Sequence, residues 1–200
     1  MASSSSDGST PGGLLLVISG PSGVGKTTIT RELQRRFDAV FSVSATTRPK
    51  APSEVEGVDY FFIDEARFDR DVEAGRFLEH ARVFGRHCYG TPREPVERHL
   101  HEGRLVMLDI DVQGALQVRQ AMPSAFMVFI LPPSESELLR RLRDRGRDDE
   151  EAIQRRFAEA KREIETARAS SAYDEFVVND HLDRAVERVV ALVEERRAKG

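Results

Sequence analysis

The chain has 200 residues, enough for one domain, or a core domain with small inserted lobes, that needs no disulfide or metal to support its core. Its 30 basic and 34 acidic residues give a net charge of −4, which argues against a general nucleic-acid binder. Cys88 is the only cysteine, which excludes an intrachain disulfide and suits a reducing compartment.

Residues 1–13 are rich in serine, glycine and proline and contain neither a basic nor an apolar stretch. We expect a disordered tail here and no signal peptide. The longest apolar run in the chain is too short to span a bilayer, so we expect a cytoplasmic protein without a membrane partner.

A phosphate-binding loop follows the first predicted strand, the apolar run at residues 14–18. The loop has the G-x-x-x-x-G-K-[ST] pattern and consists of Gly20, Pro21, Ser22, Gly23, Val24, Gly25, Lys26 and Thr27. After it, from Thr28 onward, Ile29, Leu33 and Phe37 recur every four residues, which predicts a helix. Strand, loop and helix in this order favour a nucleoside triphosphate site over a glycine-rich turn with an incidental lysine.

Backbone N–H groups and the helix N-terminus would hold the polyphosphate in such a loop. Lys26 would reach the β- and γ-phosphates, and Thr27 would be a Mg²⁺ ligand.

Strands and helices alternate along the rest of the chain. Apolar runs predict strands at residues 40–44, 60–63, 105–110, 125–131 and 176–178, and helices are expected at 65–74, 95–101, 112–122, 134–144, 150–170 and 182–197. This order predicts an α/β fold with a mostly parallel sheet flanked by helices, formed by residues 14–42 and 93–200. Residues 43–92, with short strands and little helix, are expected to form an inserted lobe.

Two carboxylates stand at the end of the predicted strand 105–110. Asp109 favours a role in holding Mg²⁺, because an acidic residue at such a strand end serves this purpose in phosphate-loop folds. The alternative is a carboxylate that caps the helix before Val112. Asp111 is two residues further on and points to the same side, where it is a candidate to bind a substrate amino group.

A dense basic zone follows, in which most arginines are expected on a solvated face. Its members are Arg140, Arg141, Arg143, Arg145, Arg147, Arg155 and Arg156. Phosphoryl transfer needs cations around the transferring group, so some of them are expected to close over the phosphates as a lid.

Other chemistries lack support in the sequence. The five histidines form no HExxH motif, and Ser22 and Ser44 have no recognisable His/Asp companions, so a covalent intermediate is not expected. The missing Asn-Lys-x-Asp segment argues against a GTPase, and a small-molecule kinase fits better.

Several segments together resemble the guanylate kinase family. They are residues 42–48 (SVSATTR), 54–62 (EVEGVDYFF), 77–81 (FLEHA), 89–91 (YGT), 108–114 (LDIDVQG), 130–134 (ILPPS) and 178–180 (VND), within a collinear match over about residues 14–195. The resemblance implies a phosphate-loop NTPase core, a GMP-binding lobe at about 43–92 and a helical lid at about 141–156. It also implies Mg²⁺-dependent in-line transfer of the ATP γ-phosphate to GMP or dGMP, by a monomer or homodimer.

The resemblance further implies a role for each matching residue. The GMP phosphate would contact Ser44, Arg48, Tyr60 and Tyr89; guanine would contact Glu79, Thr91 and Asp111; the lid arginines would be Arg141, Arg145 and Arg156; and Asn179 would lie near the ATP base. The alternatives are a packing role for the two tyrosines and a solvated position for Glu79.

The chain departs from the family pattern near the GMP phosphate. Ala51 stands where a second arginine is usual, with Lys50 as the nearest cation, and the turn at residues 85–90 is one residue longer, so Arg86 or His87 could supply a cation. We therefore expect weaker GMP affinity with largely intact chemistry. A non-catalytic peptide-binding relative and a sister kinase for another phosphorylated substrate are the competing interpretations.

Overall fold

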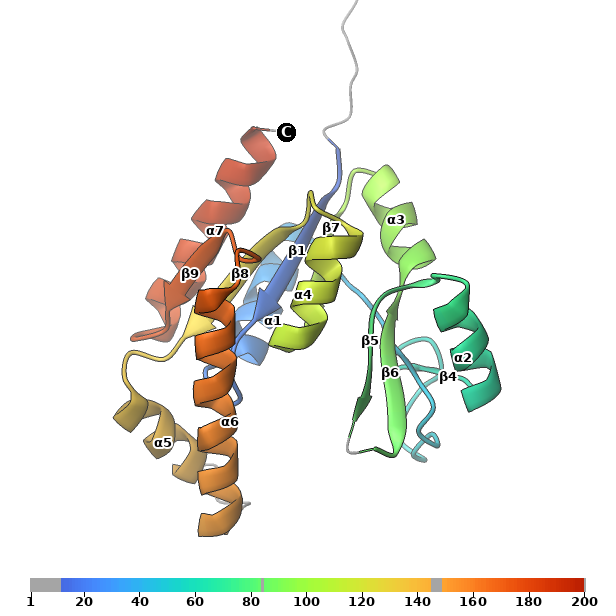
Figure 1. Cartoon of the computed structure of the whole chain (residues 1–200). Coiled ribbons are helices and arrows are strands. Elements are labelled where there is room, and N and C mark those ends of the chain that lie inside the picture. Colours follow the sequence, from blue (N-terminus) through green and yellow to red (C-terminus); the bar gives the residue numbers. More distant parts are fainter. Residues whose placement is uncertain (1–11, 84, 145–148, 200) are drawn as a thin grey trace, which may run out of the picture.

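A five-stranded parallel sheet in the order β2-β7-β1-β8-β9 is the centre of the molecule (Figure 1). The computed structural model describes residues 12–83, 85–144 and 149–199. The strands of this large sheet are β1 (Leu14–Ser19), β2 (Val40–Phe41), β7 (Leu105–Asp109), β8 (Phe126–Leu131) and β9 (Glu175–Val178). Its three central strands read as continuous apolar runs because both faces are covered.

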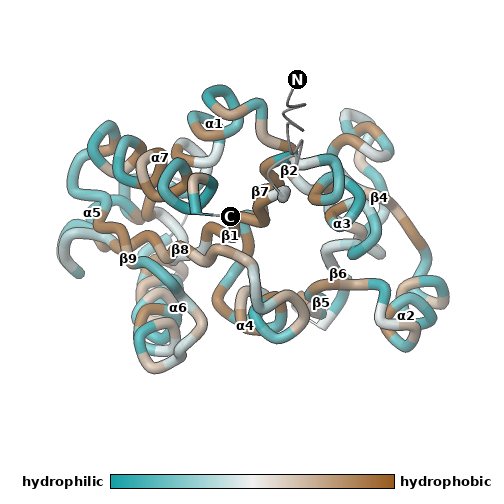
Figure 2. The backbone as a smooth tube through the Cα atoms, turned by 90° about the horizontal axis from the view of Figure 1, so that it is seen from above, coloured by the Kyte–Doolittle hydropathy of each residue, from teal (hydrophilic) through white to brown (hydrophobic). Residues whose placement is uncertain are grey.

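Helices cover the two faces of the large sheet in separate layers (Figure 2). They are α1 (Lys26–Phe37), α3 (Arg93–His101), α4 (Val112–Ala121), α6 (Glu150–Ala169) and α7 (Leu182–Ala198). Side chains alternate along β1: Leu16 and Ile18 pack with α1 and α7, while Leu15 and Val17 pack with α3 and α4. These two clusters form most of the core and fix β1, and therefore the loop that follows it.

A second sheet belongs to a small lobe, residues 45–92. The strand order is β4-β3-β6-β5, with β3 (Ala45–Thr46), β4 (Phe61–Phe62), β5 (Phe77–Val83), β6 (His87–Pro92) and one helix, α2 (Glu65–Glu73). Its core is small, with Ala45, Phe68, Phe77 and Cys88 as the buried members. Asp64 caps α2 by accepting a hydrogen bond from the Arg67 N–H at 2.6 Å, as its position before the helix predicts.

On the other side of the large sheet, α5 (Glu135–Asp144) packs against α6 (Figure 1). Arg145 and Arg147, in the connection between these helices, lie outside the described residues. Of the expected N-terminal tail, only Gly12 and Gly13 are described; the Gly13 N–H donates to the Leu100 carbonyl.

The predicted α/β fold with a parallel sheet is confirmed, and two local expectations were wrong. The strand expected at 40–44 ends at Phe41, because the chain then leaves the large sheet and starts β3 in the other one. Where only short strands were expected, β5 and β6 form a longer antiparallel pair, from Phe77 opposite Pro92 to Val83 opposite His87, because the polar residues inside β5 interrupt its apolar pattern. Among the described helices, none combines the length and apolar character that a membrane span needs.

Candidate active site

The phosphate loop joins the buried end of β1 to the N-terminus of α1. Gly23 and Gly25 have φ of 89° and 98°, a conformation that strains any residue with a side chain. At Gly25 a Cβ atom would also lie 2.5 Å from the Asn179 amide nitrogen. The glycines of the motif are therefore required by this loop conformation.

A cleft of about 460 Å³ opens beside the loop at the carboxyl ends of β1 and β7. It is lined by Gly20, Pro21, Ser22, Gly23, Gly25, Lys26, Thr27, Thr28, Asp109, Ile110, Asp111 and Glu163. The Lys26 ammonium group donates hydrogen bonds to the carbonyls of Gly20 and Pro21, so it lies over its own loop. N–H groups at a helix start, a lysine and a hydroxyl together suit a polyphosphate.

Asp109 ends β7 directly beside β1, where it pairs in register with Ile18. Burial raises the pKa of its carboxyl group, and the nearby Lys26 charge opposes this rise. Asp109 and Thr27 thus line the same cleft. The attraction of the Lys26 charge does not offset the cost of burying the Asp109 carboxylate.

Asp111 is the N-cap of α4: its Oδ1 accepts a hydrogen bond from the Gly114 N–H at 2.8 Å. The cap considered above for Asp109 is therefore formed by Asp111. One Asp111 oxygen serves the helix, and the side chain still lines the cleft.

Asn179 directly follows β9 and connects this strand to the phosphate loop. The residue is only 4% exposed, and its side-chain amide nitrogen donates to the Val24 carbonyl at 2.8 Å. Arg141 from α5 donates to the Asn179 carbonyl at 3.1 Å and to Glu137 at 2.8 Å. Asn179 therefore holds the phosphate loop in place through the Val24 carbonyl, a role that its position in the sequence did not reveal.

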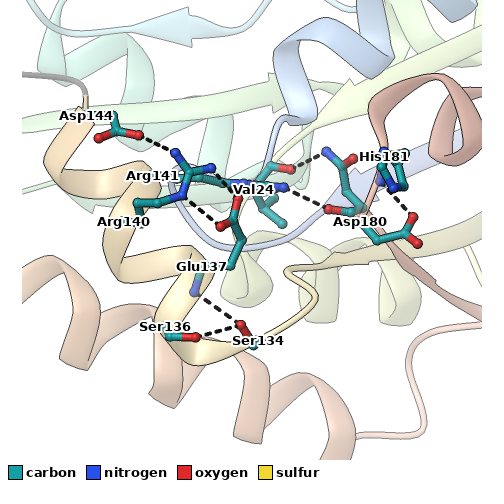
Figure 3. A network of polar contacts seen from close by, with 10 residues as sticks. Val24, Ser134, Ser136, Glu137, Arg140, Arg141, Asp144, Asp180 and His181 are labelled. Atoms are coloured by element: carbon teal, nitrogen blue, oxygen red, sulfur yellow. Dashed lines mark hydrogen bonds and ion pairs between the residues drawn. The ribbon is translucent and has the colours of Figure 1, made fainter.

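Hydrogen bonds from Arg140 and Arg141 lower the pKa of the Glu137 carboxyl to about 2. Glu137 therefore stays ionised and fixes the direction of both guanidinium groups along α5 (Figure 3).

An arginine of α6 contacts the loop directly. The Arg156 guanidinium donates to the Ser22 hydroxyl at 2.7 Å, whereas Arg141 of α5 is connected to the loop through Asn179. Of the three predicted lid arginines, Arg156 contacts the loop, Arg141 contacts Asn179 beside it, and Arg145 lies outside the described residues.

On the small-lobe side, Glu79 and Thr91 face Asp111 and the start of α4. Glu79 is 8% exposed and accepts a hydrogen bond from the Thr91 hydroxyl at 2.6 Å. Burial raises the pKa of the Glu79 carboxyl. A Cβ on Gly114 would lie 3.1 Å from Glu79 Oε2 and 3.5 Å from Asp111 Oδ1, so the two carboxylates share this space.

Gln117 holds the two elements in this arrangement. Its amide accepts a hydrogen bond from the His80 N–H and donates to the His80 carbonyl, both at 3.0 Å. The contact fixes α4 against β5 and so places Asp111 opposite Glu79. No local sequence signal identifies a pair of this kind.

Arg48 lies among aromatic rings in the small lobe. Its guanidinium is 5.4 Å from the centre of the Tyr60 ring, and Tyr60 is 5.9 Å from Tyr89. Ser44 precedes β3 in the same region, and its carbonyl accepts from Phe61. The four residues predicted to contact a phosphate are therefore contributed by neighbouring strand ends and loops of the small lobe.

Glu54 is an additional member of this group that the sequence did not single out. It forms a two-pronged ion pair with Arg48, at 2.6 and 3.0 Å, and accepts the Ala51 N–H at 2.7 Å. The hydrogen bonds that Arg48 forms with Glu54 and Tyr89 raise the pKa of the guanidinium. The hydrogen bonds that Glu54 accepts from Arg48 and the Ala51 N–H, with a smaller effect of the Lys50 charge, lower the pKa of the Glu54 carboxyl. An arriving anion must share Arg48 with this carboxylate.

Comparison with known proteins gives a consistent result over nearly the whole chain. A family model described as guanylate kinase matches residues 13–196. A guanylate kinase of Thermus thermophilus is 50% identical over 94% of this chain and 84% of its own length, and one of Thermotoga maritima is 49% identical over 94% and 89%. The crystal structure of guanylate kinase from Anaplasma phagocytophilum superposes with a TM-score of 0.70 at 34% identity, covering 94% of this chain and 87% of that one.

Proposed function

The chain belongs to the guanylate kinase family, and we propose that the cleft beside the phosphate loop is where it performs ATP-dependent phosphorylation of GMP. The resemblance inferred from the motifs is confirmed. The residue roles described next are our proposal.

The phosphate loop is the ATP side of the site. Backbone N–H groups at the start of α1 bind the phosphates, and Lys26 moves from the carbonyls of Gly20 and Pro21 to the β- and γ-phosphate oxygens. Asn179 acts through the loop, because its amide is bonded to Val24 beneath it. This hydrogen bond favours a role for Asn179 in positioning the loop, in place of the contact with the ATP base that the resemblance implied.

The small lobe is the GMP side. A carboxylate at Glu79 accepts hydrogen bonds from guanine N1–H and the 2-amino group, with Thr91 and Asp111 beside it. Adenine lacks these donors and would leave the buried Glu79 carboxylate without partners. Ser44, Arg48, Tyr60 and Tyr89 then bind the GMP phosphate.

The predicted Mg²⁺ fits the residues present. Mg²⁺ bound with a nucleotide takes few protein ligands, because substrate phosphates and water supply the rest. Thr27 and Asp109 line one cleft, and burial raises the pKa of the Asp109 carboxyl, so a cation there would compensate this carboxylate. When bound, the ion would neutralise charge on the phosphates.

Transfer requires that the GMP phosphate meets the γ-phosphate in line and without water. Arg141 and Arg156 would surround the transferring group from α5 and α6, and Arg48 would approach it from the small lobe. Closure of residues 43–92 and 141–156 over the substrates would exclude water and limit ATP hydrolysis. No side chain needs to form a covalent bond.

The approach of Glu79 to Asp111 beside the phosphate-loop cleft is the observation that carries the acceptor assignment. A coupled assay of ADP release across GMP, dGMP, AMP, UMP and ribose phosphates tests it. GMP and dGMP should be far better acceptors than the others. Equal rates with AMP and GMP would refute the guanine assignment. A cytoplasmic monomer or homodimer remains our expectation.

A further inference from the structure

Glu163 lines the phosphate cleft, although no motif assigns it a role. It projects from α6 two helical turns after Arg156, the residue that contacts the loop at Ser22. Among the described residues that line the cleft, the charged side chains are one ammonium group, Lys26, and three carboxylates, Asp109, Asp111 and Glu163. Carboxylates therefore outnumber lysines among the described lining residues of a site for a polyanion, and Arg156 adds one further positive charge at Ser22.

The charges that act on Glu163 come from three helices, α1, α4 and α6. Lys26 on α1 attracts it, whereas Glu159 on α6 and Asp111 at the start of α4 repel it. The Tyr173 hydroxyl, between α6 and β9, also interacts with the Glu163 charge. Burial is the largest influence and raises the pKa of the Glu163 carboxyl to about 7.

Free ATP carries about four negative charges near neutral pH, and a bound divalent cation cancels two of them. A carboxylate in the same partly desolvated cleft repels the free triphosphate more strongly than its cation complex. Repulsion of the wrong ligand is an established way to obtain specificity.

We propose that Glu163 is a specificity-determining residue that disfavours free triphosphate and so makes the cleft select the magnesium complex of ATP. The inference rests on the proposed function, in that the ATP phosphates occupy this cleft. Glu163 acts through charge and need not touch the metal ion.

Titration calorimetry of Glu163→Gln with ATP, once with excess Mg²⁺ and once with excess EDTA, tests the proposal. Glutamine keeps the size of the side chain and removes its charge. We expect free ATP to bind to Glu163→Gln about tenfold more tightly than to the wild type. The affinity for the magnesium complex should change less. Glu165→Gln, an exposed position that lines a different groove of α6, is the matched control and should leave both affinities unchanged.

The pH dependence is a second readout. As the pH rises from 6 to 8 the Glu163 carboxyl loses its proton, so the advantage of Glu163→Gln for free ATP should grow. The protonation of the ATP phosphates also changes over this pH range, but it affects the wild type and the variant equally and therefore does not alter the ratio of their affinities.

The proposal would be overturned if the affinity for magnesium-ATP divided by the affinity for free ATP were the same in Glu163→Gln and the wild type. It would also be overturned if this ratio fell only because the variant binds the magnesium complex more weakly, because Glu163 would then be a metal ligand. If Lys26→Met binds ATP as tightly as the wild type, the assignment of the cleft itself fails, which is a different result.

Discussion

The phosphate loop and the small lobe hold their polar groups in different ways. The loop lies between α1 and strand β1, which is buried from Leu15 to Ser19, and Asn179 and Arg156 each donate a hydrogen bond to it. The small lobe has a minor core and relies on pairs of side chains, Glu79 with Thr91 and Arg48 with Glu54. We infer that the ATP side is preorganised mainly by backbone, whereas the GMP side is tuned by side chains that can be exchanged.

The largest effect is expected on the ATP side. Lys26→Met should lower kcat about 1,000-fold or more, because it removes the one lysine among the described residues that line the cleft while α1 can still form. Steady-state ADP release measures the rate, and circular dichroism checks the fold. Lys161→Met, on α6 at the exposed ion pair with Glu135, is the control. A nearly normal rate would show that Lys26 does not act on the phosphates.

The next effect is expected on the GMP side. Glu79→Gln should lower kcat/KM for GMP about 100-fold, because the amide can no longer accept both guanine donors. The value for AMP should change little, so discrimination between the two bases should fall. Glu73→Gln, on the exposed end of α2, serves as control. An equal loss for GMP and AMP would make Glu79 a structural residue.

The support of the loop can be tested separately. Asn179→Ala leaves the Val24 carbonyl without its buried partner, which should cost about 1–3 kcal/mol of stability. The loop should also become less ordered, so the KM for ATP should rise about tenfold with little change in the KM for GMP. Urea unfolding and steady-state kinetics provide the two numbers. Loss of stability without any change in KM for ATP would separate Asn179 from nucleotide binding.

The smallest effect concerns Ala51. Ala51→Arg adds a second guanidinium beside Arg48, whose charge is already shared with Glu54, and should lower the KM for GMP about fivefold. Ala51→Met adds length without charge and should not change it. If the arginine variant brings no improvement, Lys50, Arg86 or His87 already supplies the cation.

The same contrast explains how much could be predicted from the sequence. The phosphate loop is contiguous, so its residues were identified from the pattern alone, as was the parallel sheet from its apolar strands. Glu79 and Thr91 lie 12 residues apart and meet Asp111 only because β5 packs on α4, so their roles came from the family resemblance. Asn179 with Val24, Gln117 with His80, and Glu54 with Arg48 depend on tertiary contacts that no motif encodes.

The central claim is that the two substrates bind to separate parts of one site, and calorimetric titration of ATP and GMP into Lys26→Met and Glu79→Gln tests it most directly. Lys26→Met should lower the affinity for ATP and leave the affinity for GMP near the wild-type value. Glu79→Gln should lower the affinity for GMP and leave the affinity for ATP near the wild-type value. If either variant weakens both nucleotides equally, the division of the site between the phosphate loop and the small lobe is contradicted.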